Sequence, residues 1–159
     1  MSGKLKIETV GDREIRGERV FDAPREKVWA ALTDPELIPQ WWGPRQYTTV
    51  VDVMDVRPGG QWRFVHQAEE GSDEHGFRGV YREVTEPERI VQTFEWEGMP
   101  GHIAVETMEL EDLGDGRTKI NTVSLFDTTE ERDGMFNSGM EGGASETYDR
   151  LEELLASQG

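Results

Sequence analysis

Histidine and carboxylate side chains occur within strand-like segments that are otherwise rich in aromatic residues, and they are the chain's candidates for chemistry. His66, Glu83 and Glu106 each fall at alternating positions that they share with apolar side chains. An apolar environment raises the pKa of a carboxyl group and lowers that of an imidazole, which suits general acid–base catalysis. These three residues are therefore candidates for a catalytic role, and the alternative is that they orient a ligand or hold water.

Alternation along the same segments places a larger set of side chains on one face of a sheet. Gln92 and His102 fall on this face, where buried polar groups need partners unless they lie at its wet rim. Aromatic residues mixed with a few polar groups on a concave face are typical of a ligand cavity. The residues expected to line it are Trp41, Trp42, Trp62, Phe64, His66, Phe77, Tyr81, Phe94, Trp96, His102, Glu106, Met108, Met140 and Gly143.

Other kinds of chemistry lack their residues. The chain has no cysteine, which excludes disulfides, thiolate nucleophiles and zinc–thiolate sites. Its three histidines, His66, His75 and His102, do not have the spacing of a metal-binding pair. Neither a GxSxG elbow nor a glycine-rich phosphate loop is present. We therefore expect no metal and no cofactor.

The order of the expected elements indicates an α+β protein with an antiparallel sheet. Seven strands are predicted, at 14–22, 47–56, 61–67, 76–84, 89–96, 102–111 and 118–126. Two short helices, at 26–32 and 36–42, follow the first strand, and Pro24 and Pro39 mark where the first begins and the second is limited. Trp41 and Trp42 are adjacent and cannot share one helix face, so we expect one in the core and the other nearer the cavity mouth.

The last segment, Thr129 to Ser157, has the apolar spacing of a long amphipathic helix. Thr128 and Glu131 have the spacing of a capping box at its start. The segment also contains Gly139, Gly142 and Gly143, and each glycine costs a helix about 1 kcal/mol relative to alanine. Either the helix is broken near residues 137–139, or its glycines line a cavity. Missing side chains at Gly79 and Gly143 would leave room for a ligand.

Length and charge limit the classes of partner. The 159 residues suit one domain, with a lead-in at 1–13 and a core at 14–156. The net charge of −16 disfavours nucleic acid and anionic membranes as partners. Neither a signal peptide nor an apolar run long enough to cross a membrane is visible, so we expect a cytoplasmic protein that does not insert into membranes.

Several short motifs, in order along residues 14–156, resemble one known family. They are Phe21-Asp22-Ala23-Pro24, Trp41-Trp42-Gly43-Pro44, Arg57-Pro58-Gly59-Gly60, Gly79-Val80-Tyr81-Arg82-Glu83, Glu88-Arg89-Ile90 and the closing Gly139-Met140-Glu141 with Tyr148-Asp149-Arg150-Leu151. The chain resembles the bacterial activator-of-heat-shock-protein-90-ATPase homologue-like proteins, within the START/polyketide-cyclase/Bet v 1-like (SRPBCC) superfamily.

This resemblance implies a helix-grip fold, in which a curved antiparallel sheet wraps around the C-terminal helix and leaves a cavity between them. It implies binding of a small hydrophobic molecule, because members of the superfamily bind lipids, sterols or polyketides. A cofactor-free cyclase or hydrolase for a small apolar substrate is the first alternative, since some members are enzymes. A protein-interaction or co-chaperone-like module, including a homodimer, is the second. Fold by itself does not fix function.

Overall fold

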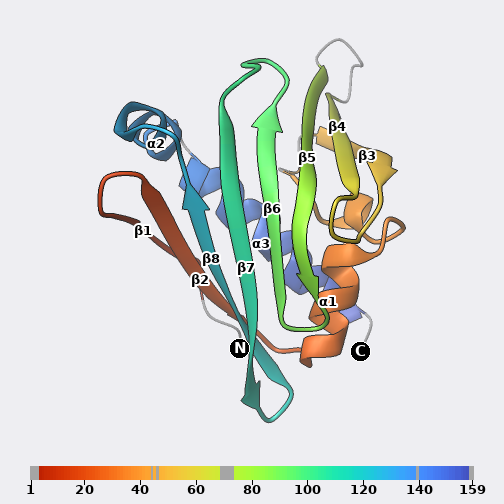
Figure 1. Ribbon diagram of the computed structural model, residues 1–159. Helices are drawn as coiled ribbons and strands as arrows, with labels where there is room; N and C mark the ends of the chain where they lie inside the picture. Colours follow the sequence, from red (N-terminus) through yellow and green to blue (C-terminus); the bar gives the residue numbers. More distant parts are fainter. Residues whose placement is uncertain (1–3, 44, 46, 69–73, 139, 158–159) are drawn as a thin grey trace.

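The computed structural model describes residues 4–43, 45, 47–68, 74–138 and 140–157, which form one antiparallel sheet and its covering helices (Figure 1). The sheet has eight strands in the order β1-β2-β8-β7-β6-β5-β4-β3. The strands are β1 (Lys6–Val10), β2 (Glu14–Phe21), β3 (Tyr47–Met54), β4 (Gln61–Ala68), β5 (Glu74–Thr85), β6 (Arg89–Trp96), β7 (Ile103–Gly114) and β8 (Arg117–Leu125). The predicted α+β helix-grip architecture is confirmed.

The extra strand lies in the segment that was expected to be a frayed lead-in. Lys6–Val10 pairs with Glu14–Phe21 across a tight turn in which Gly11 has a φ of 60°. Ile7 packs against a small core cluster that contains Ile15 and Phe126. The prediction of seven strands was wrong here because five residues carry too little alternation to indicate a strand, and the hairpin with β2 supplies the order.

The helices between β2 and β3 carry the chain from β2, the second strand from one edge of the sheet, to β3 at the opposite edge. Helix α1 (Arg25–Thr33) follows Pro24 and buries Val28, Trp29, Ala31 and Leu32. The second predicted helix is reduced to a single 3₁₀ turn, η1 (Ile38–Gln40). The 3₁₀ turn contains Pro39, which has no backbone N–H to donate, and Gly43 then adopts a φ of 94° as the chain turns away.

The terminal segment forms two helices, α2 (Thr129–Phe136) and α3 (Met140–Ser157). The predicted cap at Thr128 is confirmed, because the backbone N–H of Glu131 donates to the Thr128 hydroxyl at 3.1 Å, and this hydroxyl donates to the Glu131 carboxylate at 3.2 Å. The break falls at Asn137 and Ser138, as one of the two alternatives predicted; Gly139 lies outside the described residues.

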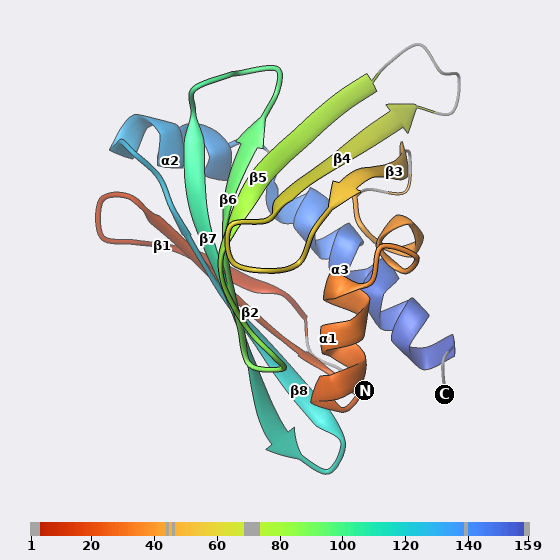
Figure 2. The same cartoon turned by 45° about the vertical axis from the view of Figure 1, so that its right-hand side comes forward.

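Helix α3 crosses one face of the curved sheet, and α1 lies beside its C-terminal half (Figure 2). Leu151, Leu154 and Leu155 of α3 are buried in the main core cluster, together with Phe21, Val28 and Trp29. Burial of one such leucine side chain contributes about 1.5–3 kcal/mol. This cluster fixes the C-terminal half of α3 on the sheet. We call the sheet face beneath α3 the inner face.

Candidate ligand-binding site

Four polar side chains from four neighbouring strands lie at one level of the inner face. Ser124 of β8 is paired with Glu106 of β7, Glu106 with Gln92 of β6, and Gln92 with Tyr81 of β5. Directly opposed residues in an antiparallel sheet project from the same face. We call Ser124, Glu106, Gln92 and Tyr81 the polar row. Register alone therefore assembles a line of hydrogen-bonding groups beneath α3.

Glu106 supplies the carboxyl group of this row. Burial raises its pKa to about 7, and a hydrogen bond from the Gln92 side chain lowers it in part. The hydroxyl of Tyr148, on α3, lies close enough that the Glu106 charge raises its pKa, after the larger effect of burial. The Tyr148 ring packs edge-on against Phe21, with centroids 5.8 Å apart. Sheet and helix thus bring a carboxyl, an amide and a phenol together.

Aromatic side chains fill the inner face on the β4 side of the polar row. The Trp42 ring contacts Trp62 and Phe64 at centroid distances of 6.4 and 5.0 Å. Phe94 lies 6.0 Å from Trp62 and 5.6 Å from Phe77. Trp42 therefore occupies this end of the expected cavity with its own indole ring.

His66 is buried among these rings rather than beside Glu106. Its imidazole stacks on Tyr47 at 5.3 Å and lies 4.8 Å from both Trp42 and Phe77. Burial, aided by the nearby charges of His75 and Arg150, lowers its pKa to about 4, so the ring is neutral at pH 7. No hydrogen bond between described residues joins His66 to Glu106, so these two candidates for acid–base catalysis are not brought together.

Two glycines explain how large rings fit so closely. A Cβ at Gly43 would collide with the His66 ring, and a Cβ at Gly79 would lie 2.5 Å from the Trp62 Nε1. Gly79 leaves no room for a ligand, contrary to the expectation from the sequence, because the Thr93 backbone carbonyl and the Trp62 indole already fill that space. At Gly143, a half-buried position, a Cβ would meet none of the described atoms within 4 Å.

The two adjacent tryptophans differ as predicted. Trp41 is 4% exposed, belongs to the main core cluster and donates its Nε1–H to the Ala31 carbonyl at 2.8 Å. Trp42 is half-buried and contacts the inner-face rings. The turn between η1 and Gly43 points the two side chains in different directions.

Two expected inward positions were wrong. The Glu83 side chain is 46% exposed and pairs with Arg89 at 3.4 Å. A β-bulge between Tyr81 and Glu83 shifts the register, so Val84 rather than Glu83 faces the core. His102 precedes β7, is 52% exposed and bonds Glu131 of α2 at 2.8 Å. Neither lies in the inner-face site.

The remaining predicted residues divide between the two parts of the inner face. Met108 lies two residues after Glu106 on β7, on the same face of the strand, and packs against the main core cluster. Trp96 is paired with Phe77 and lies at the aromatic end, 5.9 Å from His75. The Met140 side chain lies outside the described residues, although its backbone begins α3.

Ser124 and Tyr148 were not among the predicted site residues. Ser124 lies two and four positions beyond Thr122 and Ile120, which is the step that keeps a side chain on one face of a strand. Tyr148 falls one helical turn before Leu151. The spacing of both residues was visible in the sequence. Only the pairing register of β7 with β8 and the position of α3 on the sheet place Ser124 and Tyr148 beside Glu106.

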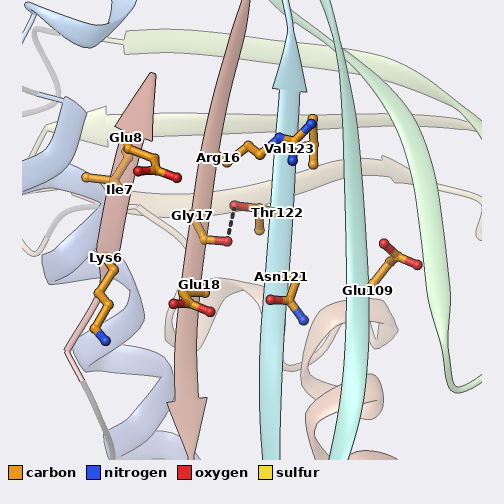
Figure 3. A pocket seen from close by; sticks show the side chains of 10 residues that line it. All are labelled: Lys6, Ile7, Glu8, Arg16, Gly17, Glu18, Glu109, Asn121, Thr122 and Val123. Carbon is orange, nitrogen blue, oxygen red and sulfur yellow. Dashed lines mark hydrogen bonds between the residues drawn. The ribbon is translucent and has the colours of Figure 1, made fainter. Parts of the chain in front are cut away.

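Two hollows lie on the opposite, outer face of the sheet. One groove of about 440 Å³ crosses β1, β2 and β8 and reaches Glu109 of β7 (Figure 3). Another of about 550 Å³ continues from Glu109 and Asn121 toward Arg25 at the start of α1. Their walls carry Lys, Arg, Glu and Asn side chains of both charge signs, so neither resembles the apolar cavity expected from the sequence.

No group of three His, Asp or Glu side chains is placed to hold a metal ion within 4–43, 45, 47–68, 74–138 and 140–157. In the same segments, none of the helices combines the length and apolar character that crossing a membrane requires.

Comparison with known proteins agrees with this architecture. A protein from Rhodobacter sphaeroides is 27% identical, with a TM-score of 0.90 over 97% of this chain and 99% of its own. One from Nitrosomonas europaea is 27% identical, with a TM-score of 0.82 over 94% and 98%. The AHSA1 protein from Silicibacter pomeroyi is 22% identical, with a TM-score of 0.75 over 92% and 99%, a likeness that shows the fold alone.

No curated protein matches the chain. The family model for the Activator of Hsp90 ATPase homolog 1-like protein matches residues 22–156, which include the strands of the polar row and both terminal helices. That match agrees with the family suggested by the short sequence motifs. The chain therefore belongs to the Activator of Hsp90 ATPase homolog 1-like protein family.

Proposed function

We propose that the protein binds a small apolar molecule on the inner face, between β6–β8 and the first half of α3. One observation carries the proposal. Along the inner face of β7, Ala104 and Leu110 are buried, whereas Glu106 and Met108 between them are only half-buried. A packed core is most buried at its middle, so greater exposure there indicates unfilled space.

The neighbouring elements support the same location. Gln92 and Phe94 on β6, and Thr122 and Ser124 on β8, are also half-buried inward positions. Open space at Gly143 lies on the helix side. An apolar enclosure with a few convergent polar groups is what small-ligand sites look like. The set proposed to touch the ligand is Gln92, Phe94, Glu106, Met108, Gly143 and Tyr148.

The family's fold is typical of ligand-binding or co-chaperone-like modules, and it does not select between them. A contiguous patch of exposed apolar side chains would favour an interaction module. The exposed apolar side chains instead lie in three places: Val50 and Val53 on edge strand β3, Val80 on β5, and Met99 and Ile103 around the β6–β7 loop. Because they are scattered, the described surface supports a ligand site better than a docking face. A homodimer through strand β3 stays an untested alternative.

Binding of an uncharged fluorescent probe, such as N-phenyl-1-naphthylamine, tests the proposal. We expect saturable binding with roughly micromolar affinity, or about −8 kcal/mol. Gly143→Leu should weaken it at least tenfold, because the new side chain enters the open space.

Gly142→Leu is the matched control for this experiment. It makes the same change one residue away, at an exposed position, and should leave probe affinity within threefold of wild type. Both variants must first melt cooperatively. Equal affinity in two folded variants, or no binding to the wild type, would show that the site is elsewhere or absent.

A further inference from the structure

The carboxyl group of Glu106 faces the proposed site without a positive charge beside it. Its hydrogen-bond partner is the neutral amide of Gln92, and no Lys, Arg or His of the described chain forms an ion pair with it. A buried carboxylate without a cation is unfavourable, whereas one with a hydrogen-bonded cation is compensated. We propose that the polar row binds the protonated amine of a small apolar ligand. This inference rests on the ligand site proposed above.

The cationic side chain whose charge acts on Tyr148 is already engaged. Arg19 of β2 influences Tyr148, but its guanidinium pairs with Asp149 at 2.8 Å and with Glu152 at 3.4 Å, both on α3. It also lies over the Phe21 ring, 5.2 Å from the centroid. These contacts hold Arg19 toward α3, so a positive charge next to Glu106 must come from a ligand.

The hydrogen-bonding capacity of the site matches an ammonium group. A carboxylate only accepts, so Gln92 donates through its amide NH₂ and presents its Oε1 as a further acceptor. The hydroxyls of Ser124 and Tyr148 can also accept. An ammonium has three donors and no acceptor, and the Glu106 carboxylate adds the strength of a charge-assisted bond. A ligand carboxylate would instead meet the like charge of Glu106.

Features outside the polar row favour the same class of ligand. The half-buried ring of Phe94, which packs on the buried Trp62, offers apolar surface to the body of the ligand and a ring that attracts cations. The net charge of −16 raises the local concentration of cations and lowers that of anions. The raised pKa of Glu106 agrees with a site that lacks its cation, since an ammonium in contact would lower it.

A series of three naphthalene probes separates the recognition of charge from the binding of the apolar body. Calorimetry at pH 8 and moderate salt would compare 1-naphthylmethylamine, 1-naphthalenemethanol and 1-naphthoic acid on the full chain. We expect the amine to bind the wild type at least tenfold more tightly than the alcohol, and the acid to bind most weakly. Equal affinities of amine and alcohol for the wild type would overturn the inference.

Two variants locate the preference. Glu106→Gln should bring amine and alcohol within threefold of each other while the affinity for the alcohol stays within threefold of wild type. Glu109→Gln removes one charge from the same strand but from the outer face, and should keep the tenfold preference. An amine preference that survives Glu106→Gln would also overturn the inference. If neither amine nor alcohol binds the wild type, the ligand site itself is refuted; alcohol binding without an amine preference refutes only this inference.

Discussion

Replacing Glu106 by Gln should change how the stability of the protein depends on pH. In the folded state burial raises the pKa of this carboxyl from 4.5 to about 7. The folded protein therefore retains a proton that the unfolded chain loses between these values. Stability from this group is fully present below pH 4.5, falls as pH rises toward 7, and does not fall further above it. Glu106→Gln keeps the size of the side chain and removes the titration.

The magnitude follows from the size of the shift. One pKa unit corresponds to about 1.4 kcal/mol, so the full effect is about 3 kcal/mol, an upper limit because the side chain is half-buried. The sequence pI of about 4.5 makes measurements near that pH impractical. Between pH 5.5 and 8.5, linkage leaves about 2 kcal/mol of the effect. The free energy of unfolding of the variant should rise by up to this much relative to wild type over that range.

Urea unfolding followed by tryptophan fluorescence measures the difference, since the chain has five tryptophans. The quantity compared is the variant's free energy of unfolding minus that of wild type, at pH 5.5 and at pH 8.5. The substitution also alters the hydrogen bond to Gln92, but the resulting loss of stability is the same at both pH values and therefore cancels when the two differences are compared. Glu111→Gln, on the outer face of β7, is the matched control and should show no such difference. A Glu106→Gln difference that is the same at both pH values would refute a buried, proton-retaining Glu106.

Two further substitutions test other parts of the inner face. Burial lowers the pKa of His66 from 6.5 to about 4, so its contribution to stability is present above pH 6.5 and is lost as pH falls toward 4. As pH falls from 7 to 5.5, the free energy of unfolding of His66→Phe should therefore rise by about 1 kcal/mol relative to that of wild type in the same urea assay. An unchanged difference would contradict the neutral, buried ring. Trp41→Phe should cost about 1–2 kcal/mol more than Trp42→Phe, because it removes both buried volume and the bond to the Ala31 carbonyl. Equal costs in thermal or urea unfolding would mean that the two rings are equivalent in packing.

The sequence alone determined the local features of this protein. The start of α1 after Pro24 and the cap at Thr128 depend on a few neighbouring residues, and both were predicted. The order of strands from β3 to β8 was predictable because antiparallel strands with one buried face show a period of two. The ordered short motifs also indicated the family, which the match to residues 22–156 shows.

Some features of the fold depend on pairings that local patterns do not record. The β1 strand is ordered by its hairpin with β2, not by its own five residues. The bulge after Tyr81 turns Glu83 outward, although simple alternation placed it inside. A single extra residue reverses every later position on the strand, so alternation fails there.

The candidate site was decided by tertiary structure. Glu106 and Gln92 were expected to face inward, but only strand register places Ser124 and Tyr81 at their level. Only the position of α3 on the sheet brings Tyr148 to Glu106, and tertiary packing places His66 among aromatic rings instead. Periodicity specifies which face a side chain takes. Which side chains meet across that face depends on register and helix placement, and these are set by contacts between residues far apart in the chain.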